Sequence, residues 1–174
     1  MRIISGTHKG RKINPPNNLL IRPTTDRAKE AIFSIIESRY FFTEKTTLDL
    51  FSGSGNISLE FASRGCNKIK AIDHNFDCVR FINNISEEFK FNISAVQSEV
   101  LKYVENCNEQ YNFIFADPPY KYKNYEELKD IIIKKRIVKK DGLLIIEHDK
   151  TTIFNDLNVE VRKYGTSHFS LFSF

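Results

Sequence analysis

Four consecutive residues combine a carboxylate, a rigid turn and an aromatic ring: Asp117, Pro118, Pro119 and Tyr120. Two adjacent prolines stiffen the chain and have no backbone N–H to donate, so the local carbonyl groups stay available as acceptors. The Asp117 carboxylate and the Pro118 carbonyl can together accept both hydrogens of one exocyclic amine and aim its lone pair at an electrophilic carbon. Tyr120 offers a ring on which an extruded base can stack. The alternative is a Pro-Pro turn that only ends a buried strand.

A glycine-rich turn is the second candidate site. Gly53 and Gly55 follow an apolar run, and glycine lets the backbone turn tightly and approach a ligand. In open parallel sheets such a turn lies at the carboxyl ends of the strands, where ligands bind. Asp73 stands at the end of the next apolar run, at the spacing where a carboxylate accepts hydrogen bonds from the hydroxyls of an adenosine ribose. The spacing therefore predicts a cofactor that contains adenosine.

The turn by itself leaves two classes of cofactor open, a dinucleotide and S-adenosylmethionine. Ser58 occupies the place of the third glycine in Gly-x-Gly-x-x-Gly, which disfavours pyrophosphate binding. Asp49 precedes the first glycine and favours the sulfonium cofactor, because the methionine end of that molecule carries an ammonium group and no phosphate. These residue types favour S-adenosylmethionine without deciding between the two.

The candidate residues follow short apolar runs that alternate with amphipathic helical patterns. Such alternation, with strands too apolar to have a wet face, predicts a Rossmann-like, mostly parallel sheet with helices on both faces. The tail departs from it: a Tyr164-Gly165 turn joins its two runs without a helix, so we expect an antiparallel pair at the sheet edge. The expected strands are 47–51, 68–73, 93–97, 112–116, 142–147, 159–163 and 169–174. The expected helices begin at Thr24 or Thr25 and near Gly55, and cover about 79–89, 99–106 and 125–135.

The first 25 residues contain five basic and no acidic side chains, whereas the other 149 have a net charge of −1. Lysine and arginine displace counterions from phosphates, so this segment is a candidate docking element for nucleic acid. A solvated hairpin has the same composition. The runs 2–5 and 11–14, around Gly6 and Gly10, predict a β-hairpin. The five basic residues are Arg2, Lys9, Arg11, Lys12 and Arg22.

The length of 174 residues fits a single domain, with a basic arm over 1–24 and an α/β core over 25–174. The 26 basic and 22 acidic side chains give a net charge of only +4. No apolar run approaches the roughly 20 residues of a membrane helix, and the start lacks a signal sequence, so we expect no membrane partner and a cytoplasmic protein. Three cysteines and four histidines are scattered singly, which predicts neither disulfides nor a metal site. Nothing requires an oligomer, and a monomer is expected.

The order of these motifs resembles the Rossmann-like amino-methyltransferases that use S-adenosylmethionine. Within that group the chain is similar, over nearly its full length, to the RsmD family of bacterial 16S ribosomal RNA guanine-N2 methyltransferases. The basic opening and the Arg22-Pro23-Thr24 segment are the specific part, because DNA adenine methyltransferases share only the catalytic tetrapeptide. The matching segments are 3–6, 9–12, 22–24, 30–33, 48–55, 117–120 and Glu147.

The resemblance implies contacts with the methionine end, the ribose and the adenine of S-adenosylmethionine. The expected residues are Asp49, Phe51, Gly53, Ser54 and Gly55 at the methionine end, Asp73 at the ribose, and Glu99 and Val100 at the adenine, with His74 either at the adenine edge or in solvent. Two positions depart from the family pattern: Ser52 replaces the usual alanine, and Glu99 stands where the family more often has Asp or Asn. Arg22 guides the RNA or the cofactor carboxylate, or only begins a helix.

The resemblance also implies the reaction, which is methyl transfer to the N2 amine of a specific guanine in 16S rRNA. The product of the cofactor is S-adenosylhomocysteine (SAH), and no metal takes part. We expect a partly assembled or complete small ribosomal subunit to be a better substrate than naked rRNA, because no separate RNA-binding domain is visible in the sequence. Three alternatives stay open: N6-adenine methylation of DNA or RNA, a nicotinamide-dependent oxidoreductase, and a catalytically idle RNA-binding assembly factor.

Overall fold

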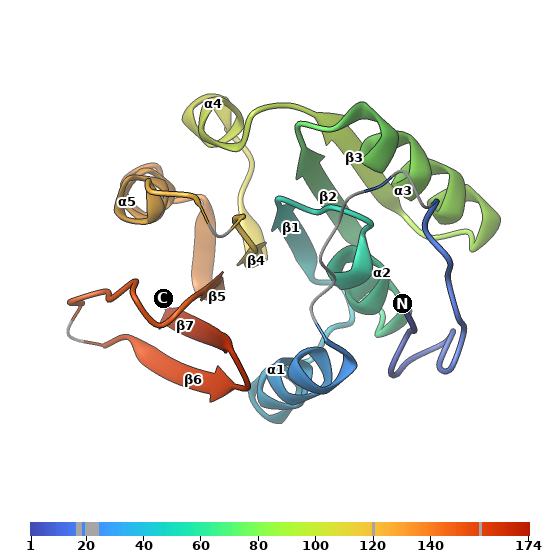
Figure 1. The fold of residues 1–174 in the computed structure, drawn as a ribbon, viewed down its shortest axis with the longest axis horizontal. Coiled ribbons are helices and arrows are strands. Elements are labelled where there is room, and N and C mark those ends of the chain that lie inside the picture. The colour runs from blue at the N-terminus through green and yellow to red at the C-terminus, as the bar shows by residue number, and fades with distance from the viewer. Residues whose placement is uncertain (17–18, 20–24, 120, 157) are drawn as a thin grey trace.

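Seven strands form one sheet in the part of the chain that the structure, a computed structural model, describes: residues 1–16, 19, 25–119, 121–156 and 158–174. Their order across the sheet is β3-β2-β1-β4-β5-β7-β6 (Figure 1). This order and the helices on both faces confirm the predicted Rossmann-like α/β fold. The strands are β1 (Thr46–Leu50), β2 (Lys68–Asp73), β3 (Ile93–Gln97), β4 (Tyr111–Ala116), β5 (Val138–His148), β6 (Glu160–Tyr164) and β7 (Ser167–Ser173).

The first five strands are parallel, and the direction in which the sheet grows reverses at β1. From β1 the sheet extends through β2 and β3 on one side and through β4 and β5 on the other. The loops that leave the carboxyl ends of β1 and β4 therefore diverge, and ligands bind in the crevice that such a reversal creates. Leu50 and Ala116 are register partners at this point. The glycine turn and the Asp-Pro-Pro turn, which follow these two residues, thus begin side by side.

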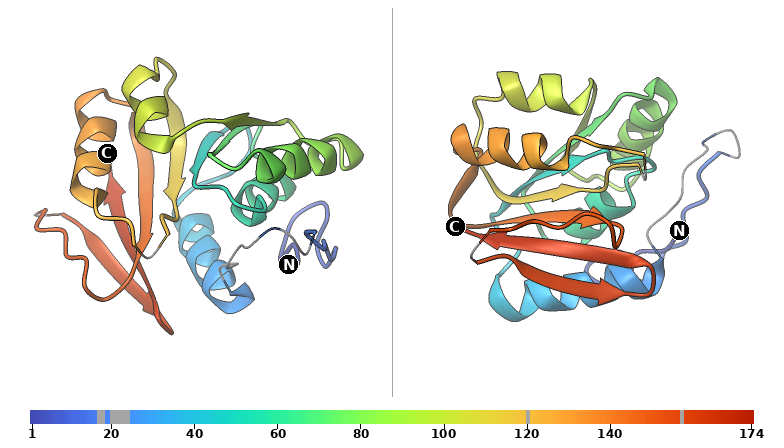
Figure 2. Two further views of the ribbon diagram at one scale, coloured as in Figure 1. Left: turned by 45° about the horizontal axis from the view of Figure 1, so that its top comes forward. Right: turned by 60° about the vertical axis from the view of Figure 1, so that its left-hand side comes forward.

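Helices cover both faces of the sheet. Three of them pack with Phe113 and Phe115 on one face, and the other two pack with Ile114 and Ile146 on the opposite face. Figure 2 shows α1 and α5 on opposite sides. None of the helices in the described ranges has the length and apolar character needed to cross a membrane. The first face has α1 (Asp26–Arg39), α2 (Asn56–Ser63) and α3 (Phe76–Glu88), and the second has α4 (Val100–Asn106) and α5 (Tyr125–Lys134).

The C-terminal strands form the predicted antiparallel pair, with β7 beside β5 and β6 at the outer edge. The fifth strand differs from the prediction, because it begins at Val138 rather than at Gly142. Its register against β4 shifts near its start. Gly142 lies at this irregularity, where an added Cβ would stand 2.7 Å from the Lys139 carbonyl oxygen. The polar residues before Gly142 therefore form a bulge within the strand and do not end it.

Residues 1–13 of the N-terminal arm form a hairpin-like turn with less regular pairing than predicted. Arg2 and Lys12 form one antiparallel bridge, and backbone hydrogen bonds join Met1 to Ile13 and Ile3 to Arg11 and Gly10, but no regular strands form there. The arm instead folds back onto the end of α2, where the Thr7 N–H donates to the Ser63 carbonyl over 2.7 Å. Gly6 makes this approach possible, since its φ is +84° and an added Cβ would lie 1.8 Å from the Ser63 oxygen. Contact with the core therefore fixes the turn of the arm, and backbone hydrogen bonds join its two ends.

Candidate active site

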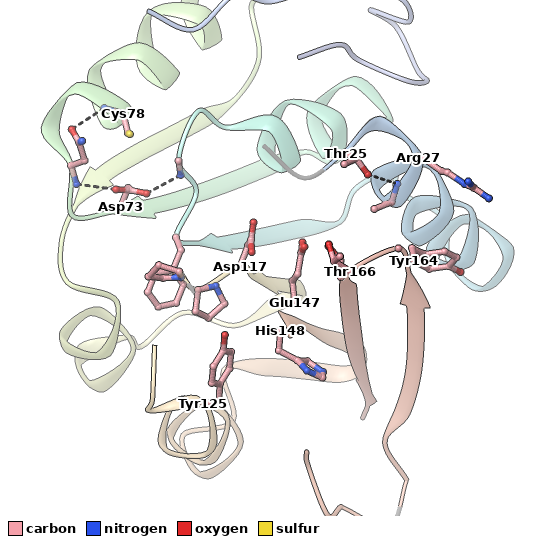
Figure 3. Close-up of a pocket in the computed structure, with 18 of the residues that line it drawn as sticks. Thr25, Arg27, Asp73, Cys78, Asp117, Tyr125, Glu147, His148, Tyr164 and Thr166 are labelled. Atoms are coloured by element: carbon pink, nitrogen blue, oxygen red, sulfur yellow. Dashed lines mark hydrogen bonds between the residues drawn. The ribbon is translucent and has the colours of Figure 1, made fainter. Parts of the chain in front are cut away.

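A cavity of about 690 Å³ opens at the carboxyl ends of β1, β2, β4 and β5 (Figure 3). This volume is typical of small-molecule sites, which span roughly 300–1,000 Å³. Two halves of the cavity meet at the turn of Asp117, Pro118 and Pro119. One half, which we call the glycine-turn half, is lined by Phe51, Gly53, Asp73, His74, Asn75 and Cys78. The other, which we call the hairpin half after the turn between β6 and β7, is lined by Thr25, Arg27, Ala28, Tyr125, Glu147, His148 and residues 164–167.

One carboxylate organises the glycine-turn half. Asp73 accepts the Gly53 N–H at 2.8 Å with one oxygen and the Asn75 N–H at 2.9 Å with the other. Asn75 in turn caps α3 by accepting the Asp77 N–H at 2.8 Å. The loops after β1 and β2 are thereby tied to the same group. Because each carboxylate oxygen has a further lone pair, Asp73 can still accept hydrogen bonds from a ligand at the cavity wall.

Asp49 lies beneath the glycine turn and does not reach the cavity. Its strand position faces α2, where one carboxyl oxygen accepts the Ser58 N–H at 3.0 Å and the Ser58 hydroxyl at 2.5 Å. Complete burial raises the pKa of Asp49 to about 7, against the opposing effect of these two hydrogen bonds. Asp49 therefore occupies the anion-binding position at the N-terminus of α2.

The turn between the halves is fixed by its backbone and by aromatic packing. The Asp117 N–H donates over 3.3 Å to the carbonyl at the end of β1. The Pro119 carbonyl accepts the Tyr122 N–H at 2.7 Å, and the Tyr122 ring packs edge-on against Phe51 with centroids 5.1 Å apart. An aromatic contact thus joins the glycine turn to the segment directly after the Asp-Pro-Pro turn.

The hairpin half is shaped by side chains. His148 donates from Nδ1 to the Asp149 carbonyl over 2.7 Å, because a carbonyl can only accept, and its Nε2 accepts the Ser170 hydroxyl at 2.8 Å. Burial lowers the pKa of His148, which favours this neutral tautomer. Burial and nearby carboxylates raise the pKa of Tyr125 to about 12, so its hydroxyl stays protonated. This half therefore presents neutral hydrogen-bonding groups beside carboxylates.

The cavity brings together only part of the predicted site. The predicted residues that line it are Phe51, Gly53, Asp73, His74, Asp117, Pro118 and Pro119. The His74 side chain is 70% exposed, and its Nδ1 lies 3.5 Å from Asp73. The predicted residues that do not line it are Asp49, Ser54, Gly55, Glu99 and Val100. Val100 is buried in the core under α4, and Glu99 is exposed at the start of that helix. Tyr120 and Arg22 lie outside the described residues.

Sequence reasoning missed most of the hairpin half. Tyr125 and His148 line the cavity, as do Thr25 and Arg27 at the start of α1. These side chains come from distant parts of the chain, and no local spacing connects them. Glu147 could have been identified from the sequence, because it ends an apolar strand at the same sheet edge as the Asp-Pro-Pro turn.

The cations of the arm lie on the surface. Arg2 pairs with Asp26 over 3.3 Å, and Arg11 pairs with Glu88 over 3.2 Å. Both arginine side chains are at least half exposed, so these pairs are weak and can exchange for phosphate contacts. Lys9 and Lys12 are exposed and form no ion pair with any described residue.

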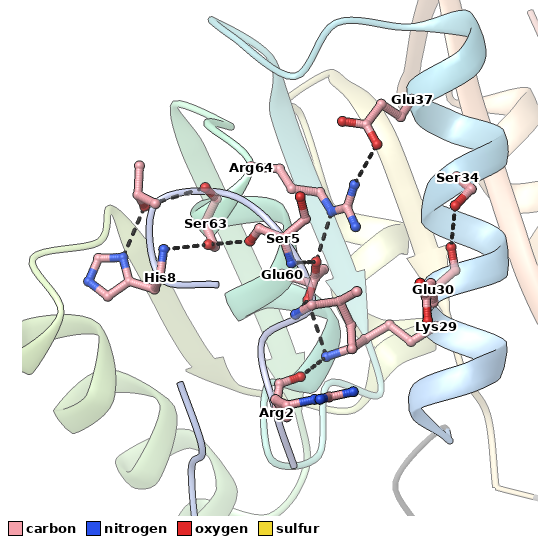
Figure 4. Close-up of polar contacts among 12 residues, drawn as sticks. Arg2, Ser5, His8, Lys29, Glu30, Ser34, Glu37, Glu60, Ser63 and Arg64 are labelled. Carbon is pink, nitrogen blue, oxygen red and sulfur yellow. Dashed lines mark hydrogen bonds and ion pairs between the residues drawn. The ribbon is translucent and has the colours of Figure 1, made fainter. Parts of the chain in front are cut away.

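Buried Glu60 of α2 fixes the arm to the core (Figure 4). Its carboxylate accepts the Ile4 N–H at 2.8 Å and the Ser5 N–H at 3.0 Å. Lys29 of α1 approaches it to 3.2 Å, and Arg64 approaches it to 2.8 Å. Burial lowers the pKa of Lys29, while the charge of Glu60 opposes that effect. Because removing either partner would leave a buried charge, the arm, α1 and α2 are held as one unit.

Two of the histidines, His148 of β5 and His168 of β7, lie beside each other, with ring centroids 5.9 Å apart. Cys66, Cys78 and Cys107 are all buried and free. Across the described ranges, no group of three or more His, Cys, Asp or Glu side chains is placed to hold a metal ion.

Comparison with known proteins relates the chain to rRNA methyltransferases. Residues 1–173 match the family model described as conserved hypothetical protein 95. Ribosomal RNA small subunit methyltransferase D of Buchnera aphidicola subsp. Acyrthosiphon pisum (strain APS) is 31% identical to the chain over 151 residues. That match covers 85% of this chain and 78% of the relative.

Solved structures share the fold. Hypothetical protein TTHA0928 of Thermus thermophilus matches with a TM-score of 0.87 and 24% identity, over 100% of this chain and 99% of that one. Coclaurine N-methyltransferase bound to N-methylheliamine and SAH matches with a TM-score of 0.59 and 25% identity, over 72% of this chain and 36% of that one. Since the family model spans nearly every residue, the chain belongs to the conserved hypothetical protein 95 family, the family of ribosomal RNA small subunit methyltransferase D.

Proposed function

We propose that this protein transfers the methyl group of S-adenosylmethionine to the N2 amine of a specific guanine in 16S rRNA. The observation that carries the proposal is the shared cavity in which the Asp73–Gly53 pair meets the turn of Asp117, Pro118 and Pro119. Direct transfer requires the group that binds adenosine and the group that holds the amine to face the same space. Relatives named ribosomal RNA small subunit methyltransferase D support rRNA as the substrate.

The glycine-turn half fits S-adenosylmethionine better than a dinucleotide. Among the described residues, its lining contains no lysine or arginine to pair with a pyrophosphate. Asp49 already accepts the Ser58 N–H at the N-terminus of α2, where dinucleotide-binding folds hold the pyrophosphate. Asp73 keeps lone pairs for the two ribose hydroxyls. The N-methyltransferase solved with SAH supports the same cofactor class.

Two acceptors in the Asp-Pro-Pro turn orient the target amine. When bound, S-adenosylmethionine supplies an electrophilic methyl group on sulfur and leaves as SAH. Asp117 and the Pro118 carbonyl accept the two N2 hydrogens, which favours a tetrahedral nitrogen and directs its lone pair at the methyl carbon. The nitrogen forms one bond to carbon and loses one proton, either to Asp117 or to a water.

The arm is proposed to bind rRNA phosphates through Arg2, Lys9, Arg11, Lys12 and Arg22. Contacts of this kind are independent of sequence, so the surface of the assembled small subunit must supply the remaining selectivity. A single domain, acting as a monomer in the cytoplasm, would then both bind the rRNA and catalyse methyl transfer. The subunit is accordingly expected to react faster than naked 16S rRNA, and equal rates would contradict this part of the proposal.

The test is transfer of tritium from labelled S-adenosylmethionine to small subunits that lack this methylation, followed by nucleoside analysis of the rRNA. Label in N2-methylguanosine is expected. Label in N6-methyladenosine would keep the chemistry and replace the target, because the same turn can hold the N6 amine of adenine. If the folded protein binds SAH but transfers no label, the substrate is wrong and the cofactor assignment stands.

A further inference from the structure

Glu147 stands beside Asp117 at the floor of the cavity. In the parallel pairing of β4 and β5, Phe115 is opposite Ile145 and Ala116 is opposite Ile146. The next residues on these two strands are Asp117 and Glu147, and neighbouring strands lie about 4.8 Å apart. Both side chains extend to the same side in Figure 3, the side covered by α1. Two carboxyl groups on adjacent strands therefore face the same part of the cavity.

The backbone of Glu147 is held within the sheet. Its backbone pairs with Phe169 of β7, and the next residue, His148, is held by Ser170 and by the Asp149 carbonyl. Glu147 is only 9% exposed, yet it lines the cavity. A carboxyl group on a backbone constrained in this way and largely withdrawn from solvent can discriminate between ligands by the direction of a single hydrogen bond.

The Watson–Crick edge of guanine matches this pair of carboxyl groups. Guanine presents its N1–H directly beside the N2 amine, whereas adenine has a lone pair at N1. We propose that Glu147 accepts the N1–H of the target guanine while Asp117 and the Pro118 carbonyl hold the N2 amine. The inference rests on the proposed function and makes Glu147 the residue that selects guanine. A base with a lone pair at N1 would face the Glu147 carboxylate acceptor to acceptor, which is repulsive.

The test changes the donor on the base and the acceptor on the protein, separately and together. Small subunits are reconstituted with 16S rRNA that carries either guanine or 2-aminopurine at the target position. 2-Aminopurine keeps the amine at C2 but has a lone pair at N1. The Glu147→Gln variant keeps the shape of the side chain and offers an N–H that can donate to that lone pair. Glu105→Gln, on the exposed side of α4, is the matched control.

The expected result is a change in preference. The wild-type protein should methylate guanine at least about 100-fold more efficiently, in kcat/KM, than 2-aminopurine. Glu147→Gln should lose about 30-fold on guanine and gain on 2-aminopurine, so that the ratio of the two efficiencies falls by more than about 30-fold. Glu105→Gln should leave the ratio unchanged. SAH affinity and the thermal unfolding midpoint of each variant report on the cofactor site and on the fold.

A loss by the same factor on both bases would overturn the inference, because it would mean that Glu147 only supports the structure. If Glu147→Gln does not fold, the wild-type protein still decides, since equal use of guanine and 2-aminopurine would also overturn it. These failures leave guanine methylation, and hence the proposed function, in place. Wild-type label in N6-methyladenosine would instead remove both the proposed target and this role of Glu147.

Discussion

The two halves of the cavity are built in different ways. The glycine-turn half comes from one stretch of chain, residues 51–78, in which a single carboxylate accepts backbone N–H groups from two loops. The hairpin half is assembled from the start of α1, the start of α5, the end of β5 and the turn between β6 and β7. One half is therefore fixed by local backbone hydrogen bonds, and the other by the packing of distant elements.

This difference predicts that the two halves of the cavity respond differently to substitutions. A cofactor site made from one short stretch of backbone tolerates substitutions elsewhere in the chain. A target site made from side chains on several elements can change its ligand when a few of those side chains change. If this division holds, variants in one half should leave binding in the other half intact.

Asp117→Asn should have the largest effect and should separate the halves most clearly. The amide replaces one acceptor for the target amine with a donor, so kcat for methyl transfer should fall by about 10³-fold. SAH affinity, measured by calorimetry, should stay within about twofold, because Asp117 belongs to the proposed amine-binding turn. Asp130→Asn, exposed on α5, is the control. A large loss of SAH affinity would show that the halves are not independent.

Asp49→Asn should change how stability depends on pH. Burial raises the pKa of Asp49 to about 7 in the folded protein, whereas an unfolded chain titrates this group near roughly 4. Between these values the folded state holds the extra proton, so the free energy of unfolding should fall as the pH rises, by at most about 4 kcal/mol. The variant cannot titrate there and should lose this slope. Denaturant unfolding of the wild-type protein and the variant at about pH 4.5 and about pH 7.5 measures this slope. The same change in the free energy of unfolding for both proteins would contradict the assignment.

Asp73→Ala should weaken the glycine-turn half without changing which base is methylated. The substitution removes the acceptor for Gly53 and Asn75 as well as the proposed ribose contact. SAH affinity should fall by about 100-fold, which corresponds to one or two hydrogen bonds to a charged group. Asp77→Ala, whose carboxylate pairs with Arg80 on the surface of α3, should have little effect. An unchanged affinity would mean that the cofactor binds elsewhere.

The double substitution Lys9→Ala and Lys12→Ala should give the smallest effect. Each lysine that contacts a phosphate adds about 0.9 to the slope of log affinity against log salt concentration, so the slope for small subunits should fall by about 2. Affinity at moderate salt should drop by about tenfold. Replacing Lys102 and Lys134 on α4 and α5 provides the control. Equal effects of the two pairs would argue against the arm as the docking element.

The same division explains what could be predicted from the sequence. The glycine turn and Asp73 are connected by a short spacing, and the alternation of apolar runs predicts that their strands are neighbours. Glu147 and Tyr125 reach the cavity only through the register of β4 with β5 and the packing of α5, which no local pattern encodes. Both the residue pattern and the resemblance placed Asp49 at the methionine end of the cofactor, whereas in the structure Asp49 is hydrogen-bonded to Ser58 beneath the turn.

The boundaries of elements failed for a related reason. Strand β5 extends back to Val138 because the bulge near Gly142 is stabilised by its neighbour β4, although the sequence there has the polar character of a loop. In the arm, the alternating runs predict paired strands, but Glu60 takes the backbone N–H groups of Ile4 and Ser5. Residues 1–3 and 10–13 still pair through backbone hydrogen bonds, whereas a carboxylate from another element holds the chain just after residue 3.

The anchoring of the arm at α2 also has a consequence for the order of events during synthesis. The arm leaves the ribosome before α2, because the residues that hold it against the core follow more than fifty positions later: Glu60 for Ile4 and Ser5, and Ser63 for Thr7 and His8. Closing so long a loop is slow compared with forming local structure. The arm of a nascent chain can pair its own two ends, but it stays undocked from the core until α2 has folded. A chain whose core is incomplete would accordingly lack the shaped basic surface, which links the ability to dock to the completion of the fold.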